Sequence, residues 1–206
     1  MLYSSDWKRI LMASAHLIKE NSKMLSELDS IVGDGDHGVT VNKIANIMES
    51  TIENWNDSKL SIKEILEEIG WKIMGANGGS AGPLLGTLFI GLANGLKNER
   101  EVDKTVLKKM FISALEAMEE ISDARVGDKT MMDVLIPVVE NIKNSDADIP
   151  MMLKEVAKVA KEASDNTVKY IAKFGRAKNL KEKSIGHKDP GAVSLSLLFI
   201  GFAQGL

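Results

Sequence analysis

The 206-residue chain contains no cysteine. Disulfide bonds, a thiolate nucleophile and zinc sites with cysteine ligands are therefore excluded, and the composition fits the reducing cytoplasm. The chain also lacks a long basic run with interleaved aromatic residues, and its formal net charge is -3. A nucleic-acid-binding surface is not expected. The first residues, MLYSSDWKRI, lack the apolar core of a secretory signal.

One uncharged stretch, residues 73–96, is long enough to be considered as a membrane span. It contains seven glycines and Pro83, and its continuous apolar part begins only near Leu84 and ends before Asn94. That length suits a buried core helix better than a transmembrane helix, so no membrane association is expected. The chain length favours a single domain spanning residues 1–206.

Strands are not expected, because no convincing segment alternates apolar and polar residues between turn residues. Apolar residues recur at helical spacing instead, which predicts an all-α fold with eight helices. Ser61 and Glu64 have the spacing of a capping box that opens one helix, and Asp103 is expected to cap another. The other helices are expected at residues 5–25 and 39–55, after residues 75–83, and from near Thr130, Pro150 and Pro190.

Two nearly identical segments lie in two of these helices: LFIGLANGL at residues 88–96 and LFIGFAQGL at residues 198–206. Such a repeat is expected when two equivalent helices of one bundle bury the same small and large residues against their neighbours. The repeat therefore indicates core packing and not chemistry.

Glycine and charge concentrate in four loops, at residues 30–38, 75–83, 126–131 and 174–191. In an antiparallel up-and-down bundle, each of these loops precedes an even-numbered helix, so all four are expected at the same end. Loops that share one end of a rigid scaffold can form a single functional site.

The first loop belongs to the stretch LDSIVGDGDHGVTV, residues 28–41. Its glycines match the dinucleotide pattern G-x-G-x-x-G, but that pattern requires a preceding strand, which is not visible here. A calcium-binding EF-hand counted from Asp34 would place Ala45 where a bidentate glutamate is required. Neither a dinucleotide fold nor a dedicated calcium loop therefore explains the stretch.

Three carboxylates in this stretch, those of Asp29, Asp34 and Asp36, lie close together in sequence. Carboxylates at short range repel one another unless a cation lies among them. Magnesium is favoured, because it commonly binds a few carboxylates together with substrate phosphates, and His37 would face those phosphates. The alternative is an acidic turn that caps a helix, and the other three loops favour the metal site.

The second loop offers backbone N–H groups at Gly78, Gly79 and Ser80 just before a helix, which is an arrangement suited to phosphate. Its alternative is an ordinary glycine-rich turn. Basic side chains in the fourth loop would on their own often be no more than a solvated surface. They are Arg176, Lys178, His187 and Lys188.

Four motifs together resemble the L subunit of dihydroxyacetone kinase, the nucleotide-binding chain of the phosphotransferase-system-dependent enzyme. The resemblance covers nearly the whole chain in the family's order, and it implies an eight-helix antiparallel up-and-down barrel with a nucleotide site at one rim. The motifs are LDSIVGDGDHG, GGSAGPLLGT, GDKTMMDVLIPV and GRAKNLKEKSIGHKDPGA.

The resemblance implies ADP or ATP bound through two Mg²⁺ ions, with Asp29, Asp34 and Asp36 as the metal ligands. Arg176 and His37 would act on the phosphates as catalytic residues. The residues implied to bind the nucleotide are His37, Gly38, Val39, Thr40, Gly78, Gly79, Ser80, Ala81, Ser122, Thr130, Met131, Arg176, Asp189, Pro190 and Gly191.

In such families the nucleotide stays bound like a coenzyme. A phosphocarrier M-type subunit rephosphorylates it, and the phosphoryl group passes to dihydroxyacetone, or a related ketose, on a separate K subunit. The chain is thus expected to be inactive alone, and a transcriptional regulator is a further candidate partner. Two alternatives stay open: a nucleotide-binding sensor or adaptor without turnover, and a free-standing metal phosphohydrolase.

Three departures from the family pattern involve four positions. Ala81 replaces a hydroxyl residue of the glycine-rich loop, Ser122 and Asp123 stand where glycine and lysine are common, and Thr40 stands where asparagine is frequent. These departures leave the exact ketose and the donor protein open, whereas all three metal aspartates are present.

Overall fold

The computed structural model describes residues 1–76, 79–97 and 99–206. Within these ranges the chain is helical and has no strand beyond one isolated bridge between Leu2 and Val102, so the all-α prediction is confirmed. None of the described helices is both long enough and apolar enough to cross a membrane. The α-helices are α1 (Ser4–Glu20), α2 (Ser22–Val32), α3 (His37–Glu53), α4 (Ile62–Met74), α5 (Ala81–Asn94), α6 (Lys104–Ile121), α7 (Met132–Asn144), α8 (Ile149–Asn166) and α9 (Pro190–Gln204), with the 3₁₀ helices η1 (Thr167–Lys169) and η2 (Arg176–Ser184).

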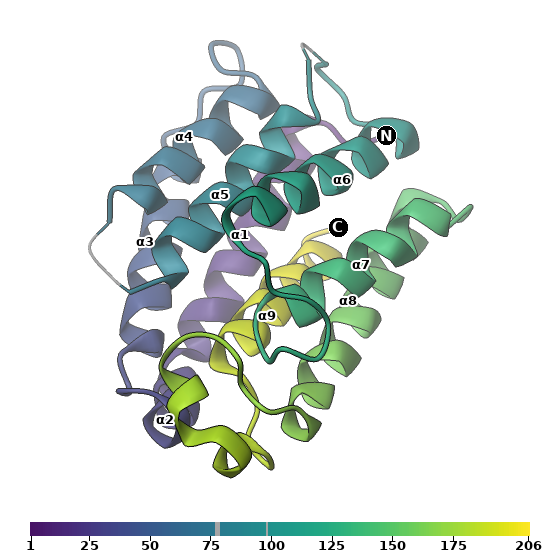
Figure 1. The fold of residues 1–206 in the computed structure, drawn as a ribbon. Helices are drawn as coiled ribbons and strands as arrows, with labels where there is room; N and C mark the ends of the chain where they lie inside the picture. The colour runs from purple at the N-terminus through teal and green to yellow at the C-terminus, as the bar shows by residue number, and fades with distance from the viewer. Residues whose placement is uncertain (77–78, 98) are drawn as a thin grey trace.

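From α3 to α9 each α-helix packs against the next one in chain order, and α9 returns to pack against α1, which also contacts α3. Figure 1 shows both termini toward one end of the molecule and α2 beside η2 at the other. Aromatic rings fill the interior between α1, α6 and α9. The rings of Phe111 and Phe199 lie 5.6 Å apart, and those of Trp7 and Phe202 lie 6.0 Å apart.

The first predicted helix, residues 5–25, is wrong in its extent, and with it the count of eight. The helix ends at Glu20, and a separate helix, α2, continues to Val32. The break lies at Asn21, whose side-chain amide donates to the carbonyl of Leu17 at 2.8 Å and so competes with the helical hydrogen bonds. Residues 30–32 are therefore helical and not part of the first loop.

The capping box predicted at Ser61 is confirmed. The backbone N–H of Glu64 donates to Ser61 Oγ at 3.2 Å, and the backbone N–H of Ser61 donates to Glu64 Oε2 at 2.8 Å. The predicted cap at Asp103 is also confirmed, because its Oδ1 accepts the N–H of Val106 at 2.7 Å. These caps fix where α4 and α6 begin.

The two repeated segments perform the same packing task in α5 and α9. A Cβ added to Gly91 would overlap the backbone of Ala114 in α6, and one added to Gly201 would overlap the backbone of Ser14 in α1. The second glycine of each copy, Gly95 or Gly205, approaches the same partner helix one turn further along. The interpretation of the repeat as core packing is therefore confirmed.

Replacing Gly201 with alanine should lower the free energy of unfolding by about 1–3 kcal/mol, because the added methyl group forces α9 away from α1. Urea denaturation measures the change. The matched control is Gly75→Ala, since a Cβ at Gly75 would lie 3.5 Å from its nearest neighbour, the carbonyl of Trp71. Equal stability of the two variants would contradict this account of the close approach.

Candidate metal and nucleotide site

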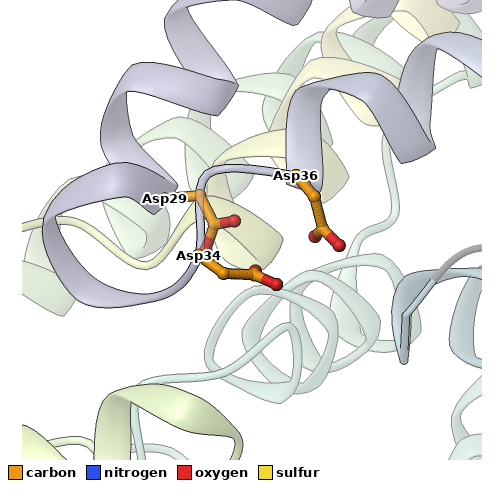
Figure 2. A group of neighbouring side chains, drawn as sticks. All are labelled: Asp29, Asp34 and Asp36. Carbon is orange, nitrogen blue, oxygen red and sulfur yellow. The ribbon is translucent and has the colours of Figure 1, made fainter.

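Three aspartates converge where α2 gives way to α3. Asp29 lies on the last turn of α2, Asp34 lies in the connecting turn, and Asp36 is the residue before α3. One carboxylate oxygen from each of the three lies within 4.8 Å of the other two. Figure 2 shows the three side chains beside the turn between α2 and α3. Asp29 is buried, whereas Asp34 and Asp36 are exposed. The structure thus brings together the predicted metal ligands.

Two glycines shape this turn. Gly33 ends α2, and a Cβ there would overlap the carboxylate of Asp29, so only glycine leaves that carboxylate in place. Gly35 has a φ of 80°, a left-handed backbone conformation that glycine adopts without strain. The backbone N–H of His37 then donates to Asp29 Oδ2 at 3.1 Å, which fixes the orientation of the buried carboxylate.

Arg176, the first residue of η2, reaches into the aspartate cluster. Its guanidinium forms an ion pair with Asp34 and lies 3.8 Å from Asp36 Oδ1. Two of the three carboxylates therefore share one basic partner, which offsets part of their mutual repulsion. This contact also joins the predicted first and fourth loops across 142 residues of sequence.

The donor set suits a hard divalent cation. Three carboxylates within 4.8 Å provide only oxygen ligands, and Mg²⁺ typically takes one or two carboxylates with phosphate oxygens and water. Asp34 and Asp36 are open to solvent, so a phosphate could approach the cluster from outside. The residues present therefore fit a magnesium site.

The ring of His37 points toward α9. Its Nε2 lies 3.0 Å from Ser194 Oγ, and that hydroxyl donates to the carbonyl of Gly191 at 2.9 Å. Burial lowers the pKa of His37, and the nearby charges of Asp29 and Asp36 oppose that shift. Sequence reasoning missed Ser194, and its polar side chain within the apolar segment AVSLSLLFIGF was the available signal.

The two segments that end the third and fourth predicted loops also meet. Met131 lies against Gly191, where an added Cβ would come within 3.2 Å of Met131 Cγ. Asp189 caps α9 by accepting the N–H of Ala192 at 2.7 Å, and desolvation raises the pKa of its carboxyl group to about 7. Asp189 is thus already engaged by the helix that it was predicted to precede.

The remaining predicted nucleotide residues occupy varied positions. Gly78 lies outside the described residues, and Ser122 follows α6, where its hydroxyl accepts the N–H of Ala124 at 3.3 Å. Lys188 from the basic loop is paired with Asp165 at 2.6 Å. The other predicted nucleotide-binding residues differ in exposure. Val39, Gly79 and Ser80 are exposed, Thr130 is half-buried, and Gly38, Thr40, Ala81 and Pro190 are buried.

The model of one family, described as the DAK2 domain, matches residues 31–204. The chain belongs to the DAK2 domain family. Among DAK2 relatives, it is 33% identical over 205 residues to the "PEP-dependent dihydroxyacetone kinase 1, ADP-binding subunit DhaL" of Listeria innocua, which covers 99% of this chain and 98% of that protein. It is 32% identical over 185 residues to the corresponding Escherichia coli subunit, with 88% and 87% coverage. The resemblance to L subunits is confirmed.

A solved structure shares this DAK2 fold. The dihydroxyacetone kinase of C. freundii in complex with AMP-PNP and Mg²⁺ aligns with a TM-score of 0.71 at 24% sequence identity. The alignment covers 97% of this chain and 33% of that longer chain. At this identity the likeness shows the fold alone, and the ligands in that complex belong to the C. freundii enzyme.

Proposed function

We propose that this chain is the nucleotide-binding subunit of a phosphoenolpyruvate-dependent dihydroxyacetone kinase. The observation that carries the proposal is the convergence of Asp29, Asp34 and Asp36 in a chain that belongs to the DAK2 family. The listerial and E. coli relatives, which match this chain over most of their length, are named as ADP-binding subunits of such a kinase. The barrel form of the bundle and a location in the cytoplasm are part of the same proposal.

The three aspartates would hold two Mg²⁺ ions, which supply charge neutralisation for the phosphates of bound ADP or ATP. The backbone N–H of His37 holds Asp29 in the orientation that such binding needs. Arg176, already at the edge of the cluster, would hold the phosphates in line for transfer. Gly79 and Ser80 immediately before α5 offer further backbone donors to a phosphate.

The division of labour follows from the subunit assignment. An M-type phosphocarrier would rephosphorylate the bound nucleotide, and a K subunit would present dihydroxyacetone or a related ketose. In this arrangement the ketose is held by the K subunit, so the chain alone would be inert toward the sugar. A transcriptional regulator is a further proposed partner.

Omitting components one at a time tests this assignment. We expect phosphoenolpyruvate-driven formation of ketose phosphate with this chain, its cognate K subunit and its phosphocarrier, and a loss of product when any one is omitted. Product formation is measured by phosphorus NMR. Robust phosphorylation by this chain alone with free ATP would overturn the assignment. Retained nucleotide without turnover, with every cognate partner present, would favour the sensor alternative.

A further inference from the structure

Lys129 is a buried charged residue in the GDKT turn before α7. Only 2% of its surface is exposed, and its backbone has a φ of 63°, which is uncommon for a residue other than glycine. Lysine side chains are almost never this buried unless the ammonium group is paired. The position of this ammonium therefore needs a specific account.

The ammonium of Lys129 joins segments that are far apart in sequence. It donates to the carbonyl of Thr167 at 2.6 Å and to the carbonyl of His187. Thr167 begins η1, directly after α8, and His187 lies just before α9. The Lys129 side chain thus joins the turn before α7 to both ends of the segment that connects α8 to α9.

Two carboxylates complete the network. Both oxygens of Asp133 accept backbone N–H groups of the same turn, from Gly127 and Thr130, each at 2.6 Å. The second carboxylate is that of Asp189. The backbone N–H of Asp189 donates to Thr167 Oγ1 at 3.0 Å, and Thr167 is also the residue whose carbonyl accepts from Lys129. Burial lowers the pKa of Lys129, and the nearby charges of Asp189 and Asp133 oppose that shift.

Loss of the ammonium would leave the carbonyl of His187 without this donor and the carbonyl of Thr167 with only the backbone N–H of Tyr170, at 3.2 Å. It would also remove a positive charge from the neighbourhood of Asp133 and Asp189. Such uncompensated polar groups are costly in a poorly solvated interior, and loops can avoid the cost by moving apart. Movement of these loops would displace Met131 and Gly191, two of the proposed nucleotide-binding residues. Met131 lies two residues after Lys129 and packs against Gly191.

We propose that Lys129 is a positioning residue that fixes how Met131 and Gly191 lie against each other, and thereby the part of the proposed nucleotide site that these two residues form. The inference rests on the proposed function for its ligand, Mg-ADP. It rests on the hydrogen bonds to Thr167 and His187 for its geometry. Among the described residues, the ammonium of Lys129 donates to Thr167 and His187 and not to Arg176, Gly79 or Ser80, so Lys129 acts through the loops that it joins.

The absence of cysteine from the chain allows a chemical test. Lys129→Cys is prepared, alkylated with 2-bromoethylamine while unfolded, and refolded, which restores an ammonium group on a side chain of lysine length. Lys129→Met supplies the uncharged side chain of similar size. Lys154→Cys, at an exposed position on α8, passes through the same treatment as the control. Calorimetry with Mg-ADP and amide hydrogen exchange at Gly127 and Thr130 are measured on each protein.

We expect Lys129→Cys and Lys129→Met to bind Mg-ADP at least about tenfold more weakly, because each removes the ammonium donor from a buried polar network. Exchange at the two amides should accelerate by a similar factor. Aminoethylation of Lys129→Cys should restore both quantities to within about threefold of the parent, since the donor returns to its place. Such a recovery would show that the ammonium group itself is required, and not merely a side chain of this size.

Several results would overturn the inference: unchanged nucleotide affinity in a folded Lys129 variant, unchanged amide exchange, or no recovery after aminoethylation while the treated Lys154 control binds normally. If neither unmodified variant folds, Lys129 serves folding as a whole and the specific positioning role is rejected. If the parent protein itself fails to bind Mg-ADP, the proposed function fails. The exchange measurements then decide separately whether Lys129 holds the loops.

Discussion

Asp34→Ala should abolish the retention of magnesium and nucleotide, with the affinity for ADP in the presence of Mg²⁺ falling at least about a hundredfold. The substitution removes one of three convergent carboxylates and leaves two, of which Asp29 is buried. Bound cations would then be undercompensated and would lose ligand oxygens. Isothermal calorimetry with Mg²⁺ and ADP measures the loss.

The control for this change is Asp57→Ala, which removes an exposed carboxylate that lies 4.0 Å from Lys8, outside the cluster. Exposed ion pairs of this kind contribute little to stability, so the control should fold and bind as the parent does. Asp34→Ala that still bound Mg-ADP as tightly as the parent would show that the aspartate cluster is not the metal site.

Much of the fold could be predicted from the sequence, because caps and apolar spacing act locally. Ser61 and Glu64 are three residues apart, and their reciprocal hydrogen bonds depend on little else. The break at Asn21 was missed, because apolar residues continue on both sides and only a side-chain hydrogen bond to Leu17 interrupts the helix. Local competition of this kind is not visible in a hydrophobic pattern.

In the candidate site, too, contacts between residues close in sequence could be predicted, and contacts between distant segments could not. Asp29, Asp34 and Asp36 lie within eight residues of one another, so their proximity was already evident in the sequence. The ring of His37 meets Ser194 across 157 residues, and Lys129 meets His187 across 58. Contacts between distant segments depend on how the helices pack. The sequence can mark Ser194 as an unusual polar residue in an apolar segment, but it does not show that its partner is His37.

Arg176→Ala should separate metal binding from phosphoryl transfer. The guanidinium forms an ion pair with Asp34 and lies 3.8 Å from Asp36, so it competes with a cation for two proposed ligands. Its removal should leave Mn²⁺ binding, measured by electron paramagnetic resonance, unchanged or tighter. Phosphoryl transfer with the full set of partners should nevertheless slow by about 10²- to 10³-fold, because a permanent cation is lost where charge shifts between phosphate oxygens.

The matched control is Lys178→Ala, which removes an exposed cation from the same 3₁₀ helix. It tests whether the loss of any nearby positive charge slows phosphoryl transfer, and we expect nearly normal transfer in this variant. Arg176→Lys keeps the charge but loses the planar fork that can bind two oxygens at once, so it should recover transfer only in part. If Arg176→Ala lost both Mn²⁺ binding and transfer, Arg176 would instead be needed to assemble the aspartate cluster. The proposal that it binds phosphate would then be rejected.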